Sequence, residues 1–218
     1  MPLAFSSRLV GFALALLLAG ASSPVVFAQQ DDTSARAAAV LDLVNTARVQ
    51  AGLQPVARST ELDASAQVHS VDMVQQNYLD HVGSDGSSPQ ERADKAGYHV
   101  PVNTGWIVVE VISAISADPS GPANWWLGDG QHRRVLLNPR WREVGVGYGQ
   151  GGQYGTYWTA DFGCRPGVLP TVVFMGTTYT SSEQCGDPSV GAALAPTPTV
   201  LPSPTLPTPS TPAPTPQG

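Results

Sequence analysis

The chain has 218 residues, with 11 Lys or Arg and 17 Asp or Glu, which gives a formal net charge of −6. An acidic chain without a basic cluster argues against a nucleic-acid-binding protein and against binding to anionic lipid through charge alone. The densest basic patch is formed by four arginines between residues 133 and 142, and nearby acids dilute it. We therefore expect no nucleic-acid partner.

The first 28 residues have the composition of a secretory signal peptide. Arg8 is their only charge, an apolar stretch runs from Leu9 to Ala21, and residues 26–28 suit signal peptidase. The alternative is a membrane anchor, but a span needs roughly 20 apolar residues, which is more than this stretch offers. We therefore expect a secreted, extracellular protein, associated with the cell envelope or free, and no transmembrane helix in the mature chain.

The other end of the chain is rich in proline. Residues 192–218 are mostly Pro, Thr, Ser, Ala and Leu, and such a segment cannot bury enough apolar surface to offset the entropy of ordering it. We predict a disordered tail there, and a spacer, a glycosylated stalk or an envelope link are its alternative roles. Between the ends we predict one folded domain over residues 35–165 and a small β extension over residues 166–191.

Two cysteines are present, Cys164 and Cys185. In an exported chain such a pair predicts one disulfide, here tying the β extension to the domain. A redox-active pair is the weaker interpretation, because the spacing is not C-x-x-C.

Two helices are predicted in the first part of the domain. Apolar residues recur at helical spacing between Ala37 and Ala51, and Gly52 follows. A second helix begins at Ser59 or Thr60 and ends near residue 76, with four residues on one face: Leu62, Ala66, His69 and Met73. His69 is therefore interpreted as a core histidine with a hydrogen-bond partner, rather than as a functional group.

A loop dense in Gly, Asp and Ser follows and contains His81. His81 is not part of a helical or strand pattern, so periodicity does not predict that it packs in the core. Loops on a rigid scaffold often hold binding groups. The alternative is an ordinary surface histidine. Ser88, Pro89 and Glu91 then have the spacing of a capping box, which predicts a short helix ending at Gly97.

Residues 106–115 are almost wholly apolar and rich in β-branched side chains, which predicts a buried strand. Glu110 lies in the middle of this run. A buried carboxylate is costly unless it is paired, hydrogen-bonded or bound to a metal, so Glu110 is a candidate functional residue. The alternative is a strand with one solvent-exposed face, on which Glu110 lies in water.

The last part of the domain contains the second histidine of interest. A short helix carries Trp125 and Trp126, both expected in the core, and a Gly-Asp-Gly break that includes Asp129 precedes His132 on a further short turn of helix. Residues 143–149 and 155–163 are predicted to form a hairpin, and residues 169–174 to add a strand.

The order of these pieces resembles the CAP superfamily of cysteine-rich secretory, antigen 5 and pathogenesis-related proteins, in particular its bacterial secreted branch with an SCP domain. The resemblance runs from about residue 37 to residue 163, and its motifs are specific in combination rather than singly. The residues that carry it are Leu43-Val-Asn45, Arg48, Gly52-Leu53, His69-Ser-Val-Asp-Met73, Asp80-His81, Gly86-Ser-Ser-Pro89, Arg92 to Gly97, Trp126, His132-Arg133, Leu137-Asn138-Pro139, Glu143-Val-Gly-Val-Gly147 and Trp158-Thr-Ala-Asp-Phe162.

The resemblance implies an α+β fold, a three-layer α-β-α sandwich with a short antiparallel sheet. It also implies a cleft lined by two histidines and two acids. The histidines fall on His81 and His132. The first acid falls on Glu110, which stands between two valines where the family has a Gly-Glu-Asn triplet, and the second falls on Asp129, three residues after Trp126.

Two imidazoles with supporting carboxylates are suited to zinc or another divalent cation. We therefore expect His81 and His132 to bind a metal with Glu110 in support, in a monomeric, extracellular binding module. Its ligand is unidentified, and the resemblance implies lipids, sterols or envelope components. The alternatives are a metal-dependent hydrolase with Glu110 as general base, and a structural domain that binds nothing. No H-E-x-x-H motif, serine elbow or free cysteine nucleophile supports the enzyme.

Overall fold

The computed structural model describes residues 24–100, 108–181 and 185. Most of the expected leader and the whole of the expected tail lie outside this part of the chain. The helices and strands are, in chain order, α1 (Pro24–Gln50), β1 (Ala57–Arg58), α2 (Thr60–Gln76), α3 (Pro89–Lys95), β2 (Val109–Ser113), α4 (Ser120–Gly128), α5 (Gly130–Leu136), β3 (Glu143–Gly151), β4 (Gly155–Gly163), β5 (Thr171–Phe174) and β6 (Thr177–Thr180).

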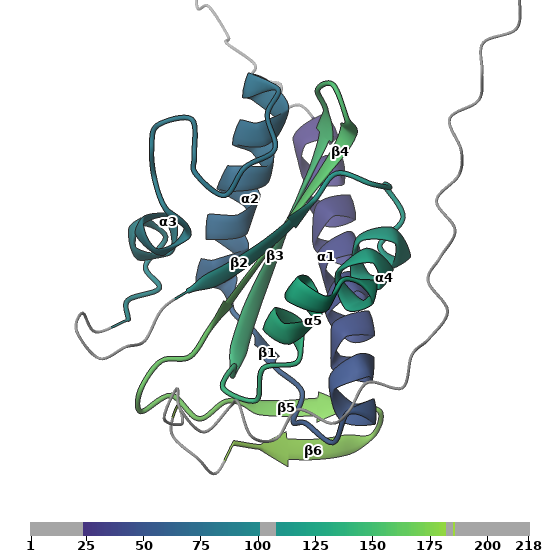
Figure 1. Ribbon diagram of the computed structural model, residues 1–218, viewed down its shortest axis with the longest axis vertical. Helices are drawn as coiled ribbons and strands as arrows, with labels where there is room; N and C mark the ends of the chain where they lie inside the picture. Colours follow the sequence, from purple (N-terminus) through teal and green to yellow (C-terminus); the bar gives the residue numbers. More distant parts are fainter. Residues whose placement is uncertain (1–23, 101–107, 182–184, 186–218) are drawn as a thin grey trace, which may run out of the picture.

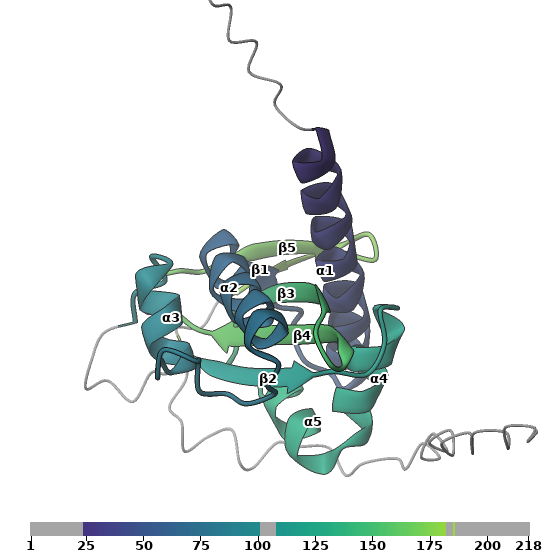
Figure 2. The ribbon, with the colours of Figure 1, turned by 90° about the horizontal axis from the view of Figure 1, so that it is seen from above.

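The fold is a sandwich of helices around one central sheet. The sheet has the strand order β1-β3-β4-β2, with β1 parallel to β3 and the other pairs antiparallel. Helices α2 and α3 cover one face, and α1 and α4 cover the other, while α5 lies beside the edge strand β2 (Figures 1 and 2). The predicted α+β class and the three α-β-α layers are thereby confirmed.

The face of the sheet toward α1 and α4 is apolar. Alternate residues of the strands point to this side, and they pack against Trp126 of α4, Leu136 of α5 and Val40 of α1 in one hydrophobic core. The strand residues in this core are Val111, Val144, Val146, Tyr148, Trp158, Ala160 and Phe162. Burial of this side chain layer is the main hydrophobic contribution to the stability of the domain.

The face toward α2 differs, because glycines of β3 let the helix approach the sheet very closely. A Cβ atom on Gly145 would lie 2.0 Å from the backbone carbon of Leu62, and one on Gly147 would lie 2.3 Å from the backbone of Ala66. Both distances are far below van der Waals contact. The alternating Gly-x-Gly pattern of β3 therefore sets the position of α2, and with it the position of the loop that follows α2.

Three local expectations need correction. Helix α1 begins at Pro24 rather than near Ala37, since no helix-breaking residue interrupts the segment between them and proline is favoured in a first helical turn. Strand β1 was not predicted, because two residues carry no periodicity. Trp126 is fully buried, but Trp125 is 36 % exposed and lies against His132, so only one of the two tryptophans packs in the core.

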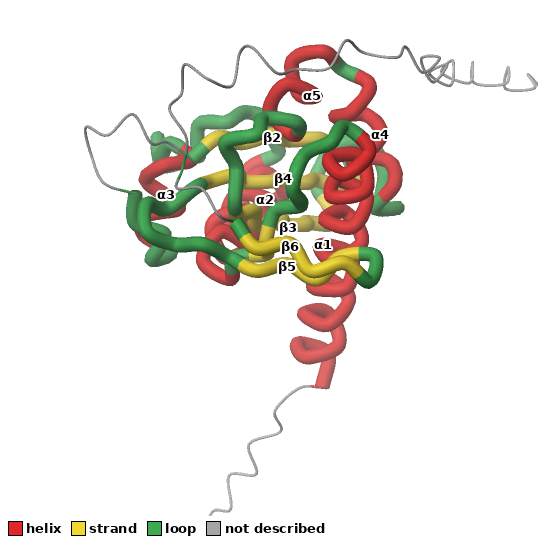
Figure 3. Tube along the Cα trace, turned by 90° about the horizontal axis from the view of Figure 1, so that it is seen from below, coloured by secondary structure: helices red, strands yellow, loops and turns green. Residues whose placement is uncertain are grey.

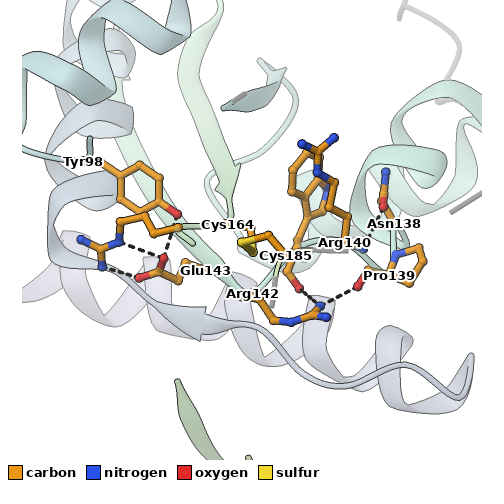
Figure 4. The surroundings of a disulfide bond; sticks show 10 residues. Tyr98, Asn138, Pro139, Arg140, Arg142, Glu143, Cys164 and Cys185 are labelled. Carbon is orange, nitrogen blue, oxygen red and sulfur yellow. Dashed lines mark hydrogen bonds and ion pairs between the residues drawn. A yellow bond between two sulfur atoms is a disulfide. The ribbon is translucent and has the colours of Figure 1, made fainter. Parts of the chain in front are cut away.

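The predicted disulfide between Cys164 and Cys185 is present, with a Cα–Cα distance of 5.7 Å (Figure 4). It closes over the hairpin of β5 and β6, which forms a separate two-stranded sheet below the main one (Figure 3). Next to the disulfide, Glu143 accepts hydrogen bonds from Tyr98 (2.8 Å) and from Arg165. The start of the β extension is thus fixed by a covalent bond and an ion pair together.

No helix within the described ranges is both long and apolar enough to cross a membrane.

Candidate functional site

Strand β2 places Glu110 on the side of the sheet that faces α2, where its side chain is only 1 % exposed. Its oxygens are engaged separately. His81 Nδ1 lies 2.8 Å from Oε1, and Arg92 Nη2 donates to Oε2 at 2.7 Å. The apolar flanks of residues 106–115 thus indicated burial correctly, and the alternative with Glu110 in solvent is wrong.

Arg92 connects the carboxylate to the loop that carries His81. Its guanidinium donates to the backbone oxygen of His81 (3.0 Å) and to that of Ser87 (2.8 Å), in addition to Glu110. The loop is further closed by Asp72, which accepts from the backbone and hydroxyl of Ser84 (2.9 and 2.6 Å). Because both loop and strand are held by the same arginine, His81 has a defined position although its ring is half exposed.

The contact with Glu110 determines which nitrogen of His81 carries hydrogen. A carboxylate accepts, so Nδ1 donates and Nε2 of the neutral ring retains a lone pair. The same hydrogen bond raises the pKa of His81 above its ordinary value, because it favours the charged ring.

Behind Glu110 lie two further titratable groups. His69 of α2 is fully buried, with Nε2 2.8 Å from the backbone oxygen of Asp80 and 3.6 Å from Glu110 Oε1. Asp161 of β4 is the register partner of Glu110 and accepts from Ser65 at 2.7 Å. Burial lowers the pKa of His69 and, together with the charge of Glu110, raises the pKa of Asp161.

The second histidine forms its own pair with an acid. Asp129 is the N-cap of α5 and accepts from the backbone of Gln131 and His132, and it also lies 2.7 Å from His132 Nδ1. The pKa of Asp129 is lowered, first by the backbone bond and then by the imidazole. The His132 ring packs against Trp125, with 4.6 Å between centroids. His132 therefore also has Nδ1 engaged by a carboxylate and Nε2 remaining.

The four residues are thus brought together as two pairs. Glu110 with His81 lies on the α2 side of β2, whereas α5, which carries His132, contributes Leu136 to the core on the other side. Within the described part of the chain, no hydrogen bond or ion pair joins the two pairs, and no three His, Cys, Asp or Glu side chains are placed to hold one metal ion.

The donor set nevertheless has the chemistry of a metal site. Histidine ligands of metals commonly donate their second ring nitrogen to a carboxylate, which fixes the tautomer and the ring orientation. Both His81 and His132 satisfy this pattern. Glu110 fits the role of a supporting group better than that of a direct ligand, because Arg92 and His81 already occupy its two oxygens.

Sequence reasoning missed three members of this network. Arg92, Asp161 and His69 all lie in motifs of the family resemblance, and His69 was also interpreted as a core residue, but none of the three was predicted to contact Glu110. A buried carboxylate such as Glu110 requires a positively charged partner, and this requirement indicates an arginine nearby. Choosing Arg92 among the arginines, however, required the fold.

The chain matches a family model for the cysteine-rich secretory protein family, CAP, over residues 41–162. It is 31 % identical over 123 residues to the uncharacterized protein YkwD of Bacillus subtilis (strain 168), which covers 56 % of this chain and 45 % of that protein. It is 30 % identical over 123 residues to the uncharacterized membrane protein YlbC of the same bacterium, covering 56 % and 33 %. The chain thus spans less than half the length of the curated relatives that it matches.

Among solved structures, the fold is similar to that of an extracellular protein containing a SCP domain from Bacillus anthracis str. Ames, with a TM-score of 0.54 and 24 % identity over 66 % of this chain and 45 % of that chain. This likeness concerns the fold alone, and it agrees with the observed sandwich. The family match covers more than half of the chain and contains Glu110, both histidines of the pairs and Asp129. The chain belongs to the cysteine-rich secretory protein (CAP) family.

Proposed function

We propose that this protein is a secreted binding module that holds a divalent metal ion, with zinc preferred, between the imidazoles of His81 and His132. The observation that supports the proposal is the matched state of the two rings: each has Nδ1 on a carboxylate and Nε2 free to act as a ligand. A bound ion would leave coordination positions for water or for an extracellular ligand.

A binding role is favoured over metal-dependent hydrolysis by the state of Glu110. A general base needs an oxygen within reach of the attacking water. Here one oxygen accepts from Arg92 at 2.7 Å and the other contacts His81 at 2.8 Å. The carboxylate therefore serves to orient His81 rather than to accept a proton from a reacting group.

The test is a calorimetric zinc titration of the mature protein and of single variants. His81→Ala and His132→Ala should each weaken binding at least about tenfold, since each removes one of two nitrogen ligands. Asp129→Asn should weaken it about tenfold by loosening His132, while asparagine still caps α5. The matched control is His99→Ala, because the His99 side chain is 77 % exposed and its ion-pair partner among the described residues is Asp94, at 3.8 Å.

Affinity should also rise between pH 6 and pH 8. The hydrogen bond to Glu110 raises the pKa of His81, so protons compete with the ion for this ring at the lower pH. Equal zinc affinity in the wild type, His81→Ala and His132→Ala would sink the proposal, and so would loss of binding in His99→Ala alone.

A further inference from the structure

Strands β5 and β6 form a small sheet of their own, with β6 on its lower side in Figure 1. Among the described helices and strands, β6 makes extensive contact only with β5. Three of its four residues are exposed: Thr177, Thr178 and Thr180. A two-stranded hairpin is only marginally stable in water, whereas a sheet of three or more strands is more stable. The outer edge of β6 is therefore a place where a further strand would stabilise the molecule.

The turn of the hairpin determines which backbone groups lie on this edge. The two turn residues have φ of 48° and 76°, which is typical of a two-residue loop, and the first pair beside it is Phe174 with Thr177. That pair is hydrogen-bonded, and bonded and non-bonded pairs alternate along an antiparallel ladder. The backbone N–H and C=O groups of Thr178 and Thr180 therefore point away from β5, toward the outer edge.

The edge of β6 lacks the features by which proteins usually keep edge strands apart. Such strands commonly carry charged side chains or proline. No residue from Thr171 to Ser182 is charged, and none is proline. On the β5 side, by contrast, Pro170 directly precedes the strand. The edge of β6 is thus the less protected of the two.

A second copy of this chain is the partner that this edge fits. The chain has a formal net charge of −6, so two copies repel each other over most of their surface, but this repulsion is weakest at an uncharged edge. A partner selected by its charge would find no complementary group there. Identical strands that pair antiparallel are related by a two-fold axis, so each copy supplies the donors and acceptors that the other needs.

We propose that β6 pairs with β6 of a second copy in an antiparallel arrangement, which joins two hairpins into one four-stranded sheet. Thr178 of each copy lies opposite Thr180 of the other, and the two Tyr179 residues lie at the two-fold axis. Each Thr178–Thr180 pair exchanges two backbone hydrogen bonds. The threonine side chains meet across the new pair as those of Thr171 and Thr180 do within the hairpin, where the hydroxyl oxygens are 3.4 Å apart.

The dimer departs from the monomer expected from the sequence, and it does not depend on the metal cleft. Its consequence is bivalency. Two domains held in one assembly gain avidity for a ligand that is repeated on a surface, even if each domain binds weakly.

The test is analytical ultracentrifugation of the mature protein in EDTA, so that no metal ion bridges the copies. The contact is small, so the average mass should rise from one copy toward two between about 10 µM and about 1 mM protein. Thr178→Pro removes an outward N–H but no bond to β5, and should weaken self-association at least about tenfold. The matched control is Val173→Pro at the register partner of Thr178, which alters the edge of β5 instead and should leave self-association unchanged.

Cross-linking tests the register without proline. A mixture of Thr178→Cys and Thr180→Cys should form a disulfide-linked dimer faster than either variant alone, because directly opposite residues of this kind have Cα atoms about 5.5 Å apart, within disulfide range. A wild type that stays monomeric up to about 1 mM would overturn the proposal. So would equal self-association of Thr178→Pro and Val173→Pro, or a mixture that cross-links no faster than the single variants. Zinc affinity should be the same in Thr178→Pro and the wild type, so failure of the dimer and failure of the metal site are distinguishable.

Discussion

The two faces of the central sheet are equally buried but chemically different. Toward α1 and α4 the strands present Val111, Ala160 and Phe162, which pack in one apolar core. Toward α2 the same strands present polar side chains that pair across the layers: Asp161 with Ser65 at 2.7 Å, and Thr159 with Ser70 at 2.9 Å. Apolar packing is non-directional, whereas hydrogen bonds fix partners and angles.

This difference explains why the first histidine pair lies on the α2 side. A carboxylate such as Glu110 would be costly among the apolar side chains of the α1 side. On the α2 side Glu110 contacts Arg92 and His81, and the pairing of β2 with β4 places Asp161 next to it. We infer that the apolar face supplies most of the stability and that the polar face determines where the functional groups stand.

The largest expected effect comes from adding a Cβ atom where α2 packs directly against the backbone of β3. Gly145→Ala would place a Cβ 2.0 Å from the backbone of Leu62, so α2 must shift. Overpacking of this kind costs about 3 kcal/mol or more, because backbone rather than a flexible side chain must move. Urea denaturation measures the loss. The control is Gly128→Ala, since nothing lies within 4 Å of its Cβ position, and its change should stay within about 0.5 kcal/mol.

If Gly145→Ala were as stable as Gly128→Ala, the close approach of α2 would not constrain the fold, and the contrast between the faces would lose its geometric basis.

The next effect concerns pH. Burial and the charge of Glu110 raise the pKa of Asp161 well above its ordinary value, so the folded protein keeps this proton after the unfolded chain releases it near pH 4. Above that pH the unfolded state binds fewer protons, and this group makes stability fall by about 1.4 kcal/mol per pH unit until the folded pKa is passed. Asp161→Asn removes the group.

The measurement is the stability of wild type minus that of Asp161→Asn, from denaturation between pH 4 and pH 7 in metal-free buffer. Taking the difference cancels the contributions of His69 and His81, as long as their pKa values are the same in both proteins. The difference should decrease as pH rises. A flat difference would mean that Asp161 is ionised in the folded state, and the polar face would then hold two adjacent carboxylates.

The smallest effect tests whether the hydrogen bonds of the polar face stabilise the fold or only orient it. Ser70→Ala leaves the buried Thr159 hydroxyl without its partner and should cost about 1–2 kcal/mol. Thr159→Val alone should cost a similar amount. The double variant removes both groups and should be nearly as stable as the wild type. A double variant that is as destabilised as each single variant would assign net stabilisation to this bond, contrary to the proposed division between the faces.

Local signals in the sequence predicted a large part of this fold. The Ser88, Pro89 and Glu91 pattern gave α3 with its capping box, and the alternation of residues 143–163 gave the hairpin of β3 and β4. The burial of Glu110 also followed from its neighbours. These features depend on residues close in sequence, for which periodicity and capping rules are informative.

Features that depend on distant pairing were not predicted. The two residues of β1 form a strand only because β3 lies alongside them. The contact between Glu110 and Arg92 spans 18 residues and depends on α3 packing beside β2. Trp125 is partly exposed and packs against His132 of the next helix instead of in the core. The pairing of each histidine with one acid likewise became visible only in the fold.

The covalent link between Cys164 and Cys185 encloses the hairpin of β5 and β6, whose strand residues are partly or fully exposed. Exposed hairpins are common places for proteolytic nicking. A protease that cuts this loop once would therefore not release the chain beyond Cys185, which would stay attached through sulfur. Shedding of that segment would require a reductant as well as a protease, and non-reducing electrophoresis would show a single intact band after cleavage.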